Sequence, residues 1–178
     1  NSSSPLQRAL ETTDLANSPS PLCGLEDSMR ELTFVCGVEG VKVENVASIE
    51  KMILDTIQDV ADNGVPQQQI ESVLHQLELQ QREVGGDGFP FGLQLIMGAI
   101  GNATHRGDPI AVLNLDPVLE QLHQDIKDPN FIKDLARKLL IENPHRVTLT
   151  LTPDADLAER RDLAEKNKLA NHKAGLSD

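Results

Sequence analysis

The sequence predicts an α+β fold: a small, mainly antiparallel sheet with helices packed on one face. Segments with the two-residue period of a half-buried strand lie early and late in the chain, and segments with helical periodicity lie between them. The 178 residues are enough for one domain with a substantial core. That core must be aliphatic, because the chain has four Phe and no Trp or Tyr.

The charge balance limits the classes of partner. Asp and Glu total 28 against 16 Lys and Arg, a net charge of -12. Nucleic acids and anionic membranes require a basic surface, so neither is expected to bind. A cationic peptide would be attracted, although an acidic surface can also serve solubility alone. No apolar run approaches the roughly 20 residues that span a bilayer, and "NSSSPLQRAL" has no signal-peptide pattern, so secretion is not expected.

The N-terminal third predicts a helix followed by a hairpin. In "SSSPLQRALETTDL" Ser4 can cap a helix and Pro5 suits its first position. "LCGLEDSMRELTFVCGVEG" then predicts a hairpin, with a possible strand at Leu22–Glu26 and a clearer one at Leu32–Val38, where apolar and other residues alternate. A two-residue turn at Met29 and Arg30 would pair residues whose numbers add to 59.

This register would place the chain's two cysteines, Cys23 and Cys36, directly opposite each other with side chains on one face. Two thiols alone cannot build a structural zinc site. We expect them to be reduced inside a cell and oxidisable in vitro. A turn one residue longer would move the pair out of register.

The remaining elements are mostly helices. An amphipathic helix is predicted from about Asn45 to Asp62, and a second from Gln67 to about Val84, followed by a "GGDG" linker. "FPFGLQLIMGAIGNA" predicts a short apolar helix that is buried on most sides. The other expected elements are two short helices opened by Asp-Pro, a helix from Asp128-Pro129 to Asn143-Pro144, a strand in "HRVTLTLT" at His145–Thr152, and a charged helix capped by Asp154.

One stretch, "LHQLELQQRE", raises the question of a metal site. His75 and Glu78 form H-x-x-E-L, one residue short of the H-x-x-E-H zinc-peptidase signature. On a helix His75 falls on the solvent flank, and Glu78 lies at the core boundary, where it could pair with Arg82. Zinc needs at least three protein ligands, and nothing nearby in the sequence supplies a third. An autonomous metal hydrolase is therefore nearly excluded.

The other histidines are scattered, without a carboxylate or cysteine at ligand spacing, and the chain has no nucleophile elbow, P-loop or dinucleotide fingerprint. We therefore expect no catalytic, cofactor-binding or metal-ligating residue in this chain. The scattered histidines are His105, His123, His145 and His172.

Four segments, taken in order, resemble the presequence-protease branch of the pitrilysin/insulinase zinc metallopeptidases, specifically the non-catalytic second domain of the N-terminal half. They are "SSSPLQRALETTDL", the stretch from "ELTFVCGVEG" to "LHQLELQQRE", "RGDPIAVLNLDPVLEQL", and "DPNFIKDLARKLLIENPHRVTLTLTPDADLAERRDLAEKNKL". The resemblance covers roughly residues 3 to 170. It departs from the family before Gly-Asp-Pro, where Thr104-His105-Arg106 replace a usual tryptophan.

The resemblance implies a metallopeptidase-like two-layer domain, truncated at its N-terminus, in residues 1–153, and a charged helix leading into an interdomain linker in residues 154–178. In the family, H-x-x-E-H and a distant glutamate lie in the first domain, so zinc would be bound outside this chain. The implied role is a non-catalytic, substrate-enclosing scaffold of an endopeptidase that degrades short unfolded peptides. Its partners would be the remaining domains of the same polypeptide and peptide substrates.

Two further expectations follow from the same resemblance. The alternative function is a stand-alone protein-interaction module or an inactive subunit of a peptidase-like complex. The expected location is an organelle matrix or the bacterial cytoplasm. Because strands completing the sheet would lie outside the chain, the isolated chain should expose a sheet edge and could form a two-fold homodimer through it.

Overall fold

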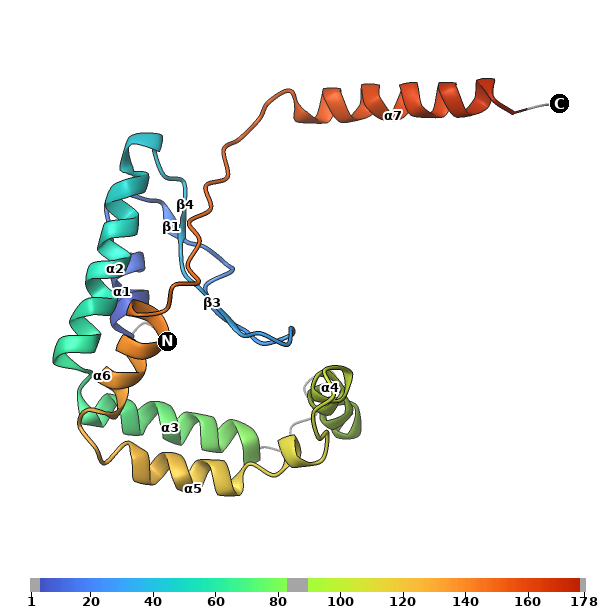
Figure 1. The fold of residues 1–178 in the computed structure, drawn as a ribbon. Coiled ribbons are helices and arrows are strands. Elements are labelled where there is room, and N and C mark those ends of the chain that lie inside the picture. Colours follow the sequence, from blue (N-terminus) through green and yellow to red (C-terminus); the bar gives the residue numbers. More distant parts are fainter. Residues whose placement is uncertain (1–3, 83–89, 177–178) are drawn as a thin grey trace. The chain divides into compact units, whose positions relative to one another are not determined.

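The structure is a computed structural model that describes residues 4–82 and 90–176. The chain divides into two units, Asn1–Arg146 and Val147–Asp178, and each is described by itself. The larger unit combines helices with short antiparallel strands, so the predicted α+β class is confirmed (Figure 1). The predicted linker at residues 85–88 lies outside the described residues, and the predicted boundary after residue 153 stays a prediction.

The elements of the larger unit begin with a helix, pass through four short strands, and continue as helices. They are α1 (Pro5–Thr12), β1 (Ser18–Pro19), β2 (Gly24–Glu26), β3 (Thr33–Val35), β4 (Val38–Glu39), α2 (Val46–Asn63), α3 (Gln67–Arg82), α4 (Phe91–Thr104), α5 (Asp116–Asp125) and α6 (Phe131–Ala136). Short 3-10 turns precede α2 and α5, at Val43–Asn45 and Ala111–Leu113, and a π-helical turn at Arg137–Ile141 extends α6. The smaller unit contains α7 (Leu157–Ala174).

The core forms where α1 packs on α2. Leu10 is 2% exposed, and Ile49, Ile53 and Ile57 present one buried stripe of α2 at intervals of four residues. Leu6, Met52 and Leu140 pack around this cluster and are partly buried. The prediction of an aliphatic core is confirmed, because aliphatic side chains make up the buried cluster.

The strands form two antiparallel ladders. In the first, Gly24 opposes Val35, Leu25 opposes Phe34 and Glu26 opposes Thr33, so the predicted register is confirmed. The second ladder, β1 with β4, was not predicted, because two residues in each strand are too few to show alternation. The sheet is therefore split into two small ladders and not continuous across its strands.

The predicted strand at His145–Thr152 is wrong. The structure assigns neither helix nor strand to these residues. Val147, Leu149 and Leu151 are 88%, 78% and 83% exposed. A strand exists only when a neighbour completes its hydrogen bonds, and alternation in sequence cannot reveal whether that neighbour is available. The segment has the pattern of a half-buried strand but belongs to neither of the two ladders in the described residues.

The predicted helix at residues 89–103 exists as α4, but the prediction that most of its surface is buried is wrong. Ile96, Met97 and Ile100 are 59%, 65% and 53% exposed, and α4 contains no buried residue. Its apolar character reflects a high intrinsic hydrophobicity on several faces. Burial additionally requires a neighbouring surface, and among the described residues the short turn Ala111–Leu113 contacts α4 without burying any of its residues.

The predicted helix ends are partly right. Asp128 accepts a hydrogen bond from the Asn130 amide at 2.9 Å, but α6 begins at Phe131, two residues after the expected Pro129. Asp154 accepts hydrogen bonds from the Asp156 amide at 3.1 Å and from Arg160 at 2.6 Å, just before α7. The Arg160 guanidinium, with the Asp156 amide, lowers the pKa of the Asp154 carboxyl from its usual value.

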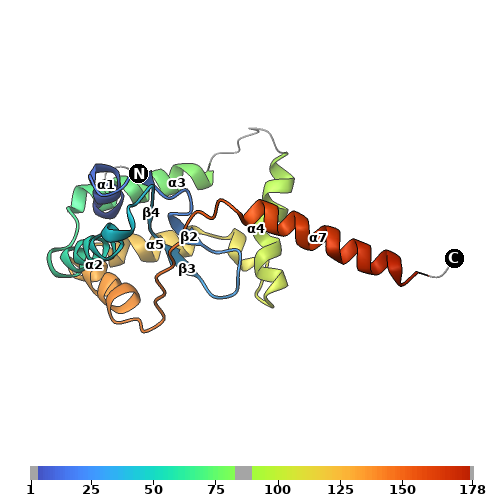
Figure 2. The same cartoon turned by 90° about the horizontal axis from the view of Figure 1, so that it is seen from above.

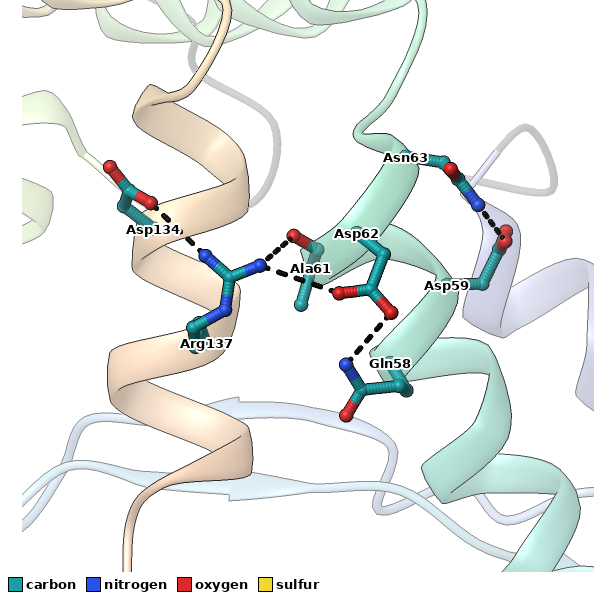
Figure 3. A network of polar contacts seen from close by, with 7 residues as sticks. All are labelled: Gln58, Asp59, Ala61, Asp62, Asn63, Asp134 and Arg137. Atoms are coloured by element: carbon teal, nitrogen blue, oxygen red, sulfur yellow. Dashed lines mark hydrogen bonds and ion pairs between the residues drawn. The ribbon is translucent and has the colours of Figure 1, made fainter.

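A guanidinium anchors α6 to the end of α2 (Figure 3). Arg137 Nη2 donates to the Ala61 carbonyl at 2.7 Å and lies 3.4 Å from Asp62, while Nη1 lies 3.3 Å from Asp134. Ala61 is fully buried. Its carbonyl lies in the last turn of α2, where the helix dipole favours a cation. The contact therefore stabilises the packing of α6 on α2.

We expect Arg137→Ala to lower the free energy of unfolding by about 1–2 kcal/mol, because it removes a charge-assisted hydrogen bond to a buried carbonyl. Lys51→Ala is the control, since the Lys51–Asp55 ion pair is exposed and should contribute less than about 0.5 kcal/mol. Urea denaturation of both variants measures the difference. Equal losses in the two variants would contradict the anchoring role of Arg137.

Candidate functional site

An apolar groove lies beside α3 and α5. Its volume is about 350 Å³. The two helices lie side by side in both views (Figures 1 and 2). The groove is lined by Ser4, Pro5, Val65, Gln69, Ile70, Val73, Leu74, Leu77, Leu122, Ile126 and Ile132.

The groove follows directly from the pattern of α3. Residues 70, 73, 74 and 77 recur at helical spacing and therefore face one direction. Leu74 and Ile126, the residue that follows α5, are 3% and 6% exposed and form the floor. Val73 and Leu77 are 39% and 44% exposed and remain open to solvent. The groove thus offers apolar contact with little polar competition, which is typical of surfaces that bind apolar side chains.

A histidine–carboxylate cluster lies beside the groove. His123 Nε2 on α5 donates to Glu78 Oε1 on α3 at 2.6 Å. His75 Nδ1 lies 3.9 Å from Glu78 Oε2, and its side chain is 69% exposed, as expected for the solvent flank. Glu78 is one residue from Leu77, and His123 is one residue from Leu122. The cluster therefore links α3 to α5 at the edge of the groove.

Sequence reasoning missed His123 as the partner of Glu78. The two residues are 45 positions apart, and no local spacing connects them. The expected Glu78–Arg82 pair involves a side chain outside the described residues. One signal in the sequence could have indicated the contact between Glu78 and His123. Residues 67–82 and 116–125 are both amphipathic, which predicts that the two helices pack together.

The cluster does not fit a zinc site. His123 Nε2 and Glu78 Oε1 are hydrogen-bonded to each other at 2.6 Å, so these two atoms cannot both be ligands of one metal ion in this geometry. In residues 4–82 and 90–176, no group of three His, Cys, Asp or Glu side chains could hold a metal ion. Among the other histidines, His105 Nε2 lies 3.3 Å from the Ser28 carbonyl. The geometry supports a role of the cluster in helix packing.

A second hollow of about 480 Å³ lies on the outer surface of α2. Its lining residues all belong to that one helix, so it is a depression between neighbouring side chains. They are Ser48, Lys51, Met52, Asp55, Thr56 and Asp59. A binding site normally brings together several elements. The groove at α3 and α5 is for this reason the better candidate.

No helix in the described part of the chain combines the length and the hydrophobicity needed to cross a membrane. No family model matches the sequence. The chain is 29% identical over 176 residues to the mitochondrial presequence protease of Xenopus laevis. The alignment covers 98% of this chain and 17% of that protein.

Two further relatives agree. Presequence protease 1 of Arabidopsis thaliana, chloroplastic/mitochondrial, is 30% identical over 178 residues, with 98% of this chain and 16% of that protein covered. The mitochondrial presequence protease of Schizosaccharomyces pombe is 28% identical over 176 residues, with 99% and 17% covered. The chain spans about a sixth of the length of these relatives. Along nearly its whole length it corresponds to one segment of the presequence proteases, and the resemblance predicted from the sequence is confirmed.

Proposed function

We propose that this chain is a non-catalytic, substrate-enclosing scaffold domain of a zinc metalloendopeptidase that degrades short unfolded peptides. The observation that carries the proposal is the similarity of 98% of the chain to a segment that forms only about a sixth of presequence proteases. Such a segment works with other parts of its polypeptide. Zinc would be bound outside this chain, because the sequence does not contain the H-x-x-E-H motif that binds it in the resembled family.

The exposed apolar surface of the chain supports this role. Ile96, Met97 and Ile100 on α4 are all more than half exposed. An isolated monomer rarely exposes so large an apolar helix, and such patches normally contact another surface. In the proposed parent, the remaining domains of the polypeptide cover α4. The apolar groove beside α3 and α5 is then available to side chains of a peptide substrate.

The charge of the chain supports a preference for cationic peptides. With a net charge of -12 it attracts positively charged ligands at a distance, and salt weakens that attraction. Apolar contacts in the groove would hold the peptide after this encounter. We further propose that the protein acts in an organelle matrix, since the relatives from animals, plants and yeast are described as mitochondrial or chloroplastic. The bacterial cytoplasm is the alternative location.

A peptide-binding assay tests this function. We expect the 178-residue chain to bind a fluorescent, cationic, unfolded peptide by anisotropy, more weakly at high salt, and to leave it intact with or without added zinc. The double variant Val73→Gln/Leu77→Gln should weaken binding by at least roughly tenfold, because burying each apolar side chain contributes about 1.5–3 kcal/mol. Both positions are partly exposed, so the fold should tolerate the change.

Leu79→Gln is the matched control, because Leu79 is 52% exposed on the same helix and does not line the groove. It should bind the peptide like the unaltered chain. Cleavage of the peptide by the isolated chain would contradict the non-catalytic role. Equal binding by the groove variant and the control would contradict the groove as the contact surface.

The alternative is a stand-alone interaction module or an inactive subunit of a peptidase-like complex. The exposed apolar surfaces of α4 and of residues 147–151 support this alternative as well as they support the scaffold domain, because a separate protein partner could also cover them. The sequence of the complete gene separates the two functions: an H-x-x-E-H motif upstream supports the peptidase domain, and its absence supports the module.

We also propose that the isolated chain forms a homodimer through residues 147–152. The alternating Val147, Leu149 and Leu151 are each more than three-quarters exposed, and the segment belongs to neither of the two strand ladders in the described residues. Two copies could pair as antiparallel strands, which would bury these apolar side chains between them.

A further inference from the structure

We propose that Cys23 and Cys36 form a reversible redox site, in which a small-molecule disulfide such as oxidised glutathione closes a disulfide bond across the base of the β2–β3 hairpin. The two cysteines are free thiols in the structure and are partly exposed. The proposal is independent of the peptidase role, because it depends only on the hairpin.

The register of the β2–β3 ladder brings the two cysteines close to each other. The pair Gly24 and Val35 ends the ladder, and continuing its register by one residue beyond that end would oppose Cys23 to Cys36. Directly opposed residues of antiparallel strands have Cα atoms about 4.5–5.5 Å apart, within the range of about 4.4–6.8 Å that a disulfide requires.

Hydrogen bonds of Cys23 support this placement independently. Its Sγ accepts from the Gly37 amide and donates to the Gly37 carbonyl, each at 3.3 Å. Gly37 directly follows Cys36, so the Cys23 side chain reaches across the hairpin to the position next to its partner thiol. A modest rotation of the two side chains, without a change of strand register, would bring the sulfurs into bonding distance.

The pair lies where the two ladders meet. Ser20 donates its amide to the Gly37 carbonyl at 2.9 Å, and β4 begins at Val38, so β1–β4 starts where β2–β3 ends. Both cysteines pack against the core cluster of Leu10, Ile49, Ile53 and Ile57. A disulfide at this position would therefore tie the hairpin base beside the core.

The surroundings of the thiols assign the order of reaction. Burial, with the neighbouring Cys23, raises the pKa of the Cys36 thiol, so Cys36 stays protonated at neutral pH. The Cys23 sulfur differs in that it accepts a hydrogen bond from the Gly37 amide. Cys23 is accordingly the attacking thiol and Cys36 the resolving thiol.

The exchange proceeds in two balanced steps. The Cys23 thiolate attacks one sulfur of oxidised glutathione, which breaks the S–S bond, releases one glutathione thiolate and leaves glutathione bonded to Cys23. Cys36 then loses its proton to water and attacks the Cys23 sulfur, and the second glutathione thiolate leaves. Two protein thiols are oxidised, one glutathione disulfide is reduced to two glutathione molecules, and the two protons pass to these products.

Incubation of the full chain with oxidised glutathione, followed by mass spectrometry under non-reducing conditions, tests the site. We expect the chain to lose two hydrogens, retain no glutathione and contain no titratable thiol. The apparent melting temperature should rise by roughly 5–10 °C, because the cross-link restricts the unfolded chain. Dithiothreitol should reverse both changes.

Two single variants form the matched controls. Cys36→Ser should stop at a stable glutathione adduct on Cys23, and Cys23→Ser should react with glutathione at least roughly tenfold more slowly, because its remaining thiol is held protonated. Circular dichroism verifies that both variants keep the fold. A lasting glutathione adduct on the unaltered chain, disulfide-linked pairs of chains, or two unreacted thiols would each overturn the proposal.

Discussion

Replacing Ile49 with alanine is expected to lower the free energy of unfolding by about 3 kcal/mol, from the range of about 2–5 kcal/mol for such truncations. Ile49 is 6% exposed and lies in the buried cluster with Leu10, Ile53 and Ile57. The change removes apolar surface and leaves a cavity that the packed interface of α1 and α2 cannot fill. Urea denaturation followed by far-ultraviolet circular dichroism measures the loss.

The matched control is Ile96→Ala, the same change in α4 at a side chain that is 59% exposed. Its effect should stay within about 0.5 kcal/mol, because little buried surface is lost and alanine is a strong helix former. The comparison cancels the difference in helix propensity between isoleucine and alanine. Similar losses in the two variants would show that α4 is packed as tightly as α2, contrary to the structure.

Replacing Val147, Leu149 and Leu151 together with threonine is expected to weaken the proposed self-association by roughly a hundredfold, about 3 kcal/mol. Threonine is β-branched and has a high strand propensity, so the preference of the segment for an extended backbone is retained. Only the apolar surface that a second copy would bury is lost. Analytical ultracentrifugation over a range of chain concentrations measures the association constant.

Leu163→Thr/Leu169→Thr is the control, because both residues are 58–60% exposed on the charged helix α7. This variant should associate like the unaltered chain. A monomer at all concentrations before any substitution would refute the homodimer. If the α7 variant loses association and the 147–151 variant keeps it, the chains contact each other through α7. The homodimer would then exist, but residues 147–152 would not form its interface.

Local chemistry made several elements predictable. The spacing of Ile49, Ile53 and Ile57 repeats at the helical period, and Gly64 follows Asn63 where α2 ends. The register of β2 and β3 depends on the short connection between them, so it could be derived from residue numbers alone. In each case the residues that decide the structure lie within one or two turns, or one hairpin, of each other.

Contacts between distant segments were not predictable in this way. The pairing of β1 with β4 involves two residues in each strand, which is too short to produce a periodic signal. The 2.6 Å contact of His123 with Glu78 depends on how α5 lies against α3. Likewise, the groove exists only because Leu122 of α5 and Ile126, which follows that helix, face the apolar side of α3.

By itself the sequence determined the α+β class, the aliphatic core, the positions of the main helices, the hairpin register and the resemblance to presequence proteases. Each of these depends on residue type and spacing along the chain. Only the tertiary structure decided which apolar residues are buried: Ile49 is enclosed by α1, whereas Val147 and Ile96 remain exposed. Burial is a property of two surfaces in contact, and a pattern along one segment describes only one of them.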